Sequence, residues 1–87
     1  MAPKAPTYFG RALCTFREDA GLSQRALARL AHVPRLSIQK VESGETSYLS
    51  FLAAARCAQA LGVSLAMFVD LDDIEETGVP TSDEETD

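Results

Sequence analysis

With 87 residues, of which 46% are apolar and 24% charged, the chain has room for one small domain with one hydrophobic core. Its apolar runs are shorter than the roughly 20 residues that cross a bilayer, and residues 1–7 show no apolar signal segment, so we expect a cytoplasmic protein without a membrane span. Two cysteines, Cys14 and Cys57, and a single histidine are too few for a disulfide scaffold or a four-ligand zinc site, so we expect no metal ion and no cofactor.

The net charge of −5 averages two very different segments. Residues 1–69 contain eight basic and four acidic residues, a balance of +4, whereas residues 70–87 contain nine acidic residues and no Lys or Arg. Segments with high charge of one sign and little apolar surface do not fold on their own. The sequence therefore predicts a mildly basic folded domain over 7–71 and a disordered acidic tail over 72–87.

The first predicted elements are an N-terminal arm and a helix. Residues 1–6 contain two prolines and little to bury, which predicts a flexible arm. Apolar residues then recur at spacings of four and three, which predicts a helix over 7–19 that ends near Gly21. The apolar face of this helix consists of Phe9, Leu13 and Phe16.

Two short helices are predicted next. Ser23 is expected to cap the first of them, because a serine oxygen accepts a hydrogen bond from a free first-turn N–H. Residues 33–34 (Val-Pro) interrupt the pattern, and the second short helix covers 35–43 with Ile38 and Val41 facing inward.

A longer helix and a last short one complete the expected domain. The longer helix begins at Ser47 or Ser50 and has Phe51 on its inward face, and the last helix covers 65–69. No stretch alternates with a period of two, so no strand is expected. Five helices with short connections predict a compact all-α domain over 7–71.

The second and third predicted helices and the short turn between them are typical of a helix-turn-helix, whose second helix lies in the DNA major groove. The stretch GLSQRALARLAHVPRLSIQKVESGE, followed by ALGVSLAMF, resembles the Cro/C1-type (XRE-like) family of DNA-binding regulators. The resemblance covers about residues 9–69. It implies a five-helix lambda-repressor-like fold and double-stranded DNA as the partner.

The resemblance also implies which residues contact DNA. Positions that match the outward side of the recognition helix, and hence the bases, are Arg35, Leu36, Ser37, Gln39 and Lys40. Arginine suits guanine and glutamine suits adenine, whereas Leu36 contacts a thymine methyl or packs locally, and Lys40 contacts a base or a phosphate. The residues expected at DNA phosphates are Ser23, Gln24, Arg25 and Thr46.

Further positions match structural features of the family. Arg17 and Glu42 match an ion pair between the first and third helices. His32 stands where a turn glycine is usual and is expected to adopt a positive φ. Pro34 replaces the usual capping Ser or Thr, and Glu45 repels phosphates in a loop that is often basic, so we expect modest affinity or binding that depends on avidity.

Apolar residues of the last two helices exceed what a small domain should expose, which predicts a homodimer. The residues expected in this dimer interface are Tyr48, Leu49, Leu52, Met67 and Phe68.

The leading functional hypothesis is a transcriptional regulator that binds a near-palindromic operator as a homodimer, and restriction–modification controllers are one subtype of it. Alternatives are an antitoxin that binds both DNA and a basic toxin, and a protein-only adaptor. The acidic tail either competes with DNA phosphates, binds a second protein or only solubilises the chain. No enzyme is expected, because no nucleophile–base pair or carboxylate pair can be placed in a pocket.

Overall fold

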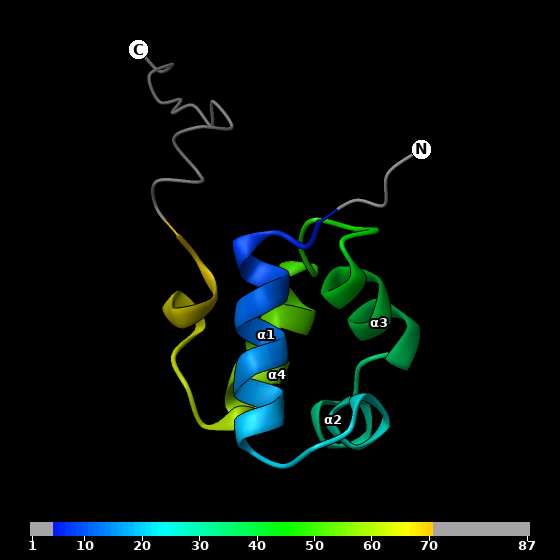
Figure 1. Cartoon of the computed structure of the whole chain (residues 1–87). Helices are drawn as coiled ribbons and strands as arrows, with labels where there is room; N and C mark the ends of the chain where they lie inside the picture. Colours follow the sequence, from blue (N-terminus) through cyan, green and yellow to red (C-terminus); the bar gives the residue numbers. More distant parts are fainter. Residues whose placement is uncertain (1–4, 71–87) are drawn as a thin grey trace.

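Figure 1 shows the helices of this computed structural model. Most of them begin at a capping side chain. The structure describes residues 5–70. These residues contain no strand and five helical elements: α1 (Tyr8–Asp19), α2 (Gln24–Ala31), α3 (Arg35–Ser43), α4 (Phe51–Leu61) and the 3₁₀ helix η1 (Leu65–Phe68). Four of them start at a hydroxyl that accepts a hydrogen bond from a first-turn N–H: Thr7 for α1, Ser23 for α2, Ser50 for α4 and Ser64 for η1. None of these helices is long and apolar enough to cross a membrane.

The turn between α2 and α3 has the backbone that the sequence predicts. His32 ends α2 in the left-handed conformation, at φ 58° and ψ 48°. Its role as a turn residue is thereby confirmed. Pro34 precedes α3 and offers no side-chain hydrogen bond to the helix. Gly44 then ends α3 at φ 89°, a value that costs glycine little.

The last element is shorter and tighter than predicted. The sequence predicted an α-helix over 65–69, but the structure has a four-residue 3₁₀ helix followed by an extended Val69. The N–H of Met67 donates to the carbonyl oxygen of Ser64, which is the i→i+3 bond of a 3₁₀ turn. The all-α prediction is confirmed for residues 5–70, with four α-helices rather than five. Residues 1–4 of the expected arm and the expected tail over 72–87 lie outside the described residues.

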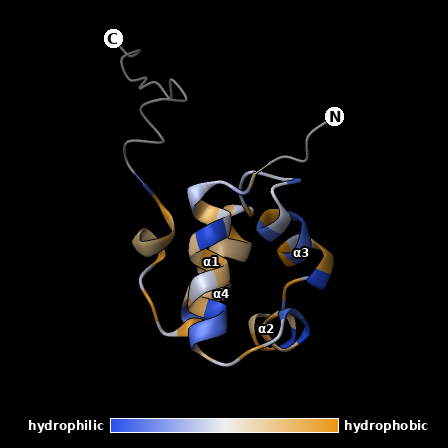
Figure 2. Ribbon diagram, in the orientation of Figure 1, coloured by the Kyte–Doolittle hydropathy of each residue, from blue (hydrophilic) through white to orange (hydrophobic). Residues whose placement is uncertain are grey.

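One hydrophobic core joins all five elements. Its fully buried side chains come from every helix: Leu13 of α1, Leu27 of α2, Ile38 and Val41 of α3, Cys57 of α4 and Phe68 of η1. Both α2 and α3 carry polar as well as apolar residues (Figure 2), as expected for helices with one buried side and one exposed side. Because α3 packs against both α1 and α2, its buried side is fixed and its other side is left outward.

Two aromatic residues lie where the sequence did not predict them. Phe68, expected in a dimer interface, is fully buried and packs its ring 5.3 Å from that of Phe9 and 6.0 Å from that of Phe16. The 3₁₀ turn brings η1 against α1, so this ring fills the core instead of the surface. Phe51, expected inward, is 77% exposed, because it is the first residue of α4 and the buried stripe of that helix begins at Ala54.

A glycine lets α1 and α3 approach each other closely. Gly10 is buried in α1, and a Cβ at this position would collide with the backbone carbonyl oxygen of Val41 in α3. No role of Gly10 was predicted from the sequence. The sequence signal that could have revealed this close approach is a glycine inside a helical pattern, because alanine at such a position favours the helix by about 0.5–1 kcal/mol.

Candidate nucleic-acid interface

The outward side of α3 carries the five residues that were expected to contact bases. Ile38 and Val41 are fully buried and anchor the opposite side of the helix. Among the outward residues, Arg35, Leu36 and Gln39 are exposed. Ser37 and Lys40 are half-buried. Leu36 is 55% exposed, which favours an outward contact over local packing. The structure thus brings all five onto one short helix.

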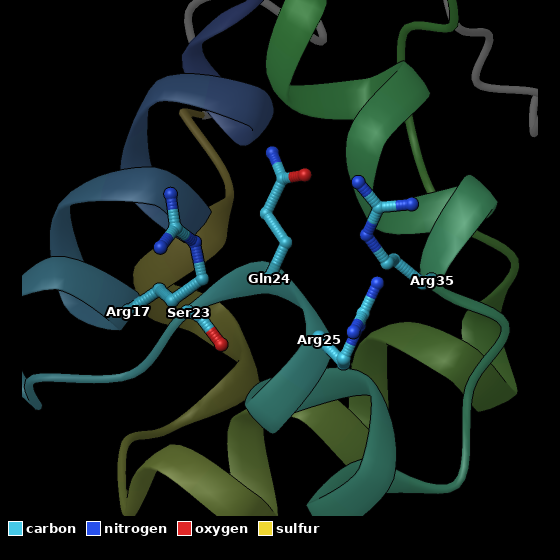
Figure 3. Close-up of a pocket in the computed structure, with 5 residues that line it drawn as sticks. All are labelled: Arg17, Ser23, Gln24, Arg25 and Arg35. Carbon is cyan, nitrogen blue, oxygen red and sulfur yellow. The ribbon is translucent and has the colours of Figure 1, made fainter.

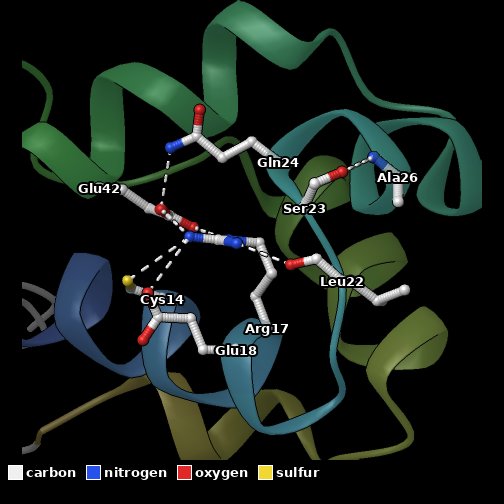
Figure 4. A network of polar contacts seen from close by, with 8 residues as sticks. All are labelled: Cys14, Arg17, Glu18, Leu22, Ser23, Gln24, Ala26 and Glu42. Carbon is white, nitrogen blue, oxygen red and sulfur yellow. Dashed lines mark hydrogen bonds and ion pairs between the residues drawn. The ribbon is translucent and has the colours of Figure 1, made fainter.

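The position of α3 is held by a carboxylate at which three helices meet (Figure 4). Arg17 of α1 donates two hydrogen bonds to Glu42 of α3, from Nε at 2.8 Å and from Nη2 at 2.9 Å. Gln24 of α2 donates from Nε2 to the same carboxylate at 3.0 Å. The side chains of Arg17 and Glu42 are only 11% and 6% exposed. The predicted ion pair is confirmed, and it is nearly buried.

Arg17 also ties α1 to the loop before α2. Its Nη1 donates to the carbonyl oxygen of Leu22 at 2.7 Å, and its Nη2 donates to the sulfur of Cys14 at 3.7 Å. The hydrogen bond to Glu42 raises the pKa of Arg17 above its ordinary value. The guanidinium therefore stays charged, and its donors are used inside the protein.

The bond from Gln24 to Glu42 was not anticipated. The family resemblance implied a phosphate contact for Gln24, from its position just inside α2. The amide carries two N–H donors, and one of them is used by Glu42. The second donor leaves the phosphate contact open, and it stays a prediction.

Three of the four expected phosphate contacts line a single groove with the start of α3. The lining residues, drawn in Figure 3, are Arg17, Ser23, Gln24, Arg25 and Arg35. This groove, which we call the arginine groove, has a volume of about 450 Å³. Arg17 is paired with Glu42, so the uncompensated positive charges of the groove come from Arg25 of α2 and Arg35 of α3. No ion pair of either residue is present within residues 5–70.

A second, smaller groove lies at the other end of α3. It has a volume of about 200 Å³, and it is lined by Ser37, Lys40, Thr46, Tyr48, Leu49, Ser50 and Ala53. Thr46, the fourth expected phosphate contact, is exposed there, and its N–H donates to the carbonyl oxygen of Lys40 at 3.2 Å. Cationic and hydroxyl groups therefore occur in a groove near each end of α3.

The expected dimer residues behave in three different ways. Tyr48, Leu52 and Met67 are about half exposed, at 50%, 56% and 49%. Leu49 is half-buried and packs against the core, and Phe68 is excluded by its complete burial. Phe51, which was expected to face inward, exposes a further large apolar side chain on α4.

Both cysteines are free thiols with raised pKa values. Burial raises the pKa of the Cys57 thiol to about 11, with a smaller contribution from the charge of Glu42. Burial and then Glu42 also raise the pKa of Cys14. Raised values keep both sulfurs as thiols, which are poor nucleophiles and poor metal ligands. Within the described part of the chain, no group of three or more His, Cys, Asp or Glu side chains is placed to hold a metal ion.

Comparison with known proteins places this geometry among helix-turn-helix domains. The family model described as a helix-turn-helix domain matches residues 9–71. Among curated proteins, no sequence matches the chain. The restriction-modification controller protein C.AhdI from Aeromonas hydrophila is similar in structure, with a TM-score of 0.66 and 31% identity over 71% of this chain and 92% of that one.

Two further solved structures share the fold. The master regulator for biofilm formation SinR, solved in complex with DNA, aligns with a TM-score of 0.69 and 22% identity, over 71% of this chain and 98% of that one. Hydroxypropylphosphonic acid epoxidase from S. wedmorenis aligns with a TM-score of 0.64 and 28% identity, over 79% of this chain but only 36% of that one. The fold thus occurs both in a small regulator and as one part of a larger enzyme.

Proposed function

This chain belongs to the helix-turn-helix domain family, as a Cro/C1-type (XRE-like) member, and from that premise we propose that it is a sequence-specific DNA-binding transcriptional regulator. It binds a near-palindromic operator as a homodimer in the cytoplasm, with α3 in the major groove. Its action is binding and not catalysis. The similarity to a restriction-modification controller at 31% identity supports a regulatory role.

The strongest support is the placement of donors around α3. A major groove about 12 Å wide admits one α-helix between two phosphate backbones. The arginine groove at the start of α3 and the groove of Lys40 and Thr46 at its end then face phosphates on both sides. Leu36 and Gln39 line neither groove and are left for the bases, and Arg35 reaches the bases from the first groove. Phosphate contacts set the register of the helix, and base contacts supply the sequence preference.

The exposed side chains of α3 suit particular bases. Arg35 matches the two acceptors of guanine, Gln39 matches the donor and acceptor of adenine, and Leu36 suits a thymine methyl group. All three are exposed, and no hydrogen bond within residues 5–70 engages the side chain of Arg35 or Gln39. Their donors and acceptors are thus available to DNA.

Apolar exposure on α4 and η1 supports the homodimer. Phe51, Leu52 and Met67 together expose large apolar side chains on two elements that pack against each other. A monomer of this size rarely leaves such a surface uncovered. A second copy of the chain would cover it and place two α3 helices on one face of the duplex.

The proposal is tested by measuring the affinity of three variants for a duplex enriched from random DNA and for an unenriched duplex. Arg35→Ala and Gln39→Ala should each lose about 1–3 kcal/mol on the enriched duplex and much less on the other, because each removes a base contact. Arg29→Ala is the matched control: Arg29 is an exposed arginine of α2 that lines neither groove.

Gln24→Ala should weaken binding to both duplexes alike, because a phosphate contact carries no sequence information. The proposed recognition face is wrong if Arg35→Ala and Gln39→Ala bind both duplexes as tightly as Arg29→Ala does.

A further inference from the structure

The arginine groove has more positive charge than the described part of the chain neutralises. Arg17 is paired with Glu42, but Arg25 and Arg35 have no carboxylate partner within residues 5–70. Two other exposed arginines use donors on the backbone: Arg11 donates to the carbonyl oxygen of Pro6, and Arg56 donates to that of His32. Arg29 is exposed without such a bond, but it lines neither groove. In this groove, two unpaired guanidinium groups line one hollow together with a serine and a glutamine.

The same chain carries a segment of opposite charge. Residues 71–87 contain eight acidic residues and no Lys or Arg. Carboxylates pair with guanidinium groups in the same two-pronged geometry that phosphates use. An acidic segment therefore offers this groove the chemistry of a DNA backbone.

The length of the segment allows the contact. The described chain ends at Asp70, and 17 residues follow it. A chain of 17 residues spans at most about 60 Å when extended. The longest dimension of the structure is 44 Å. The groove is thus within reach of the segment, and covalent attachment raises its effective concentration to the millimolar range for a linker that spans the gap.

We propose that the acidic segment 71–87 occupies the arginine groove of its own chain when DNA is absent. The contact depends on close approach, because charges farther apart than about 8 Å are screened in physiological salt. The contact itself needs only Arg25, Arg35 and the carboxylates. Its consequence for DNA rests on the proposed function: the segment competes with DNA for Arg25 and Arg35, and it lowers the affinity for any duplex by the fraction of chains whose groove is occupied.

The contact is tested in the full chain by NMR of arginine side-chain N–H signals at low salt. The variant replaces the eight acidic residues of 71–87 with Asn or Gln, which keeps length and shape. The signals of Arg25 and Arg35 should differ between the two chains, and those of Arg29 and Arg56 should coincide as internal controls. High salt should move the wild-type signals to the positions seen in the variant.

Identical Arg25 and Arg35 signals in the two chains at low salt would overturn the proposal. NMR signals of core residues that coincide between the wild type and the variant show that the variant remains folded. A lost contact then cannot be mistaken for unfolding. Changes spread equally over all arginines would also overturn it, because they show a diffuse field and not an occupied groove.

The consequence is tested by DNA affinity across a salt series. If two ion pairs of ordinary surface strength are lost, the variant should bind random duplex roughly twofold to thirtyfold more tightly at low salt. This advantage should shrink as salt rises. Equal affinities at every salt concentration would overturn the competition. If the NMR contact is present but neither chain binds DNA, the contact stands and the proposed function fails.

Discussion

Glu42 illustrates how much of the interface depends on single residues. Its carboxylate accepts hydrogen bonds from Arg17 of α1 and Gln24 of α2, so it fixes the recognition helix against both neighbours. The family resemblance predicted the pair with Arg17. It did not predict the bond from Gln24, because a glutamine at the start of a helix has the same sequence pattern whether it faces DNA or a neighbouring helix.

Breaking this pair on one side should be costly. Arg17→Met leaves a nearly buried carboxylate without its cation, so the free energy of unfolding should fall by about 3–5 kcal/mol. The double variant Arg17→Met with Glu42→Leu should lose much less, because no charge is stranded. The measurement is denaturant unfolding in a double-mutant cycle.

Glu18 provides the control for that cycle. It lies 3.8 Å from Arg17, but its side chain is 67% exposed, so Glu18→Gln should change stability by less than about 1 kcal/mol. Additive effects of the Arg17 and Glu42 substitutions would show that the two side chains do not interact.

The raised pKa of Cys57 predicts that the folded chain loses stability at alkaline pH. Burial raises the pKa of its thiol from 9.0 to about 11 in the folded chain, so the unfolded chain loses this proton first. The free energy of unfolding therefore keeps its full value below pH 9 and falls as the pH rises toward 11. The total loss from this thiol is about 2–3 kcal/mol.

The check is urea unfolding between pH 8 and pH 11. Cys57→Ala lowers stability at every pH by leaving a cavity, but it should also flatten the decline between pH 9 and pH 11. A decline as steep as that of the wild type would contradict the assignment to Cys57.

At the scale of elements, the sequence predicted most helices well and their ends less well. The spacing of apolar residues and the caps predicted α1 to α4, because helical periodicity is a local property. The fate of Phe51 and Phe68 is not local. Both are apolar residues at the end of an element: the packing of η1 on α1 buries Phe68, and the buried stripe of α4 begins only after Phe51.

The contact of α1 with α3 depends on Gly10. Gly10→Ala should destabilise the fold by about 1–3 kcal/mol, although alanine favours the helix itself, because its Cβ collides with the backbone of Val41. Thermal and urea unfolding measure the loss. The matched control is Thr15→Ala, which introduces an alanine at an exposed site of α1 and should have a small effect. A neutral or stabilising Gly10→Ala would contradict the close approach.

At the scale of the whole molecule, the dimer decides how two recognition helices are spaced. Leu52→Glu and Met67→Glu should shift sedimentation at micromolar concentration from dimer to monomer, because each places a charge in a buried apolar interface. Leu30→Glu is the control: Leu30 is 57% exposed but lies on α2, outside the proposed interface. A wild-type monomer at every accessible concentration would remove the homodimer from the proposal.

The charge distribution was the most informative whole-molecule feature of the sequence. The net charge of −5 argues against DNA, whereas the basic residues of the folded part form the arginine groove and the surface of α3. Sequence alone gave the sign of each segment. It did not show that Arg25 and Arg35, ten residues apart, line one groove, because the turn at His32 sets that distance.

The claim that α3 reads DNA is tested most directly by selection of bound sequences from a random duplex pool. The wild-type chain should enrich a palindrome whose half-sites lie about 34–36 Å apart, or a multiple of that spacing. Gln39→Ala should enrich the same palindrome with adenine preference lost at one position of each half-site. A wild-type pool that shows no common sequence after selection would contradict the account.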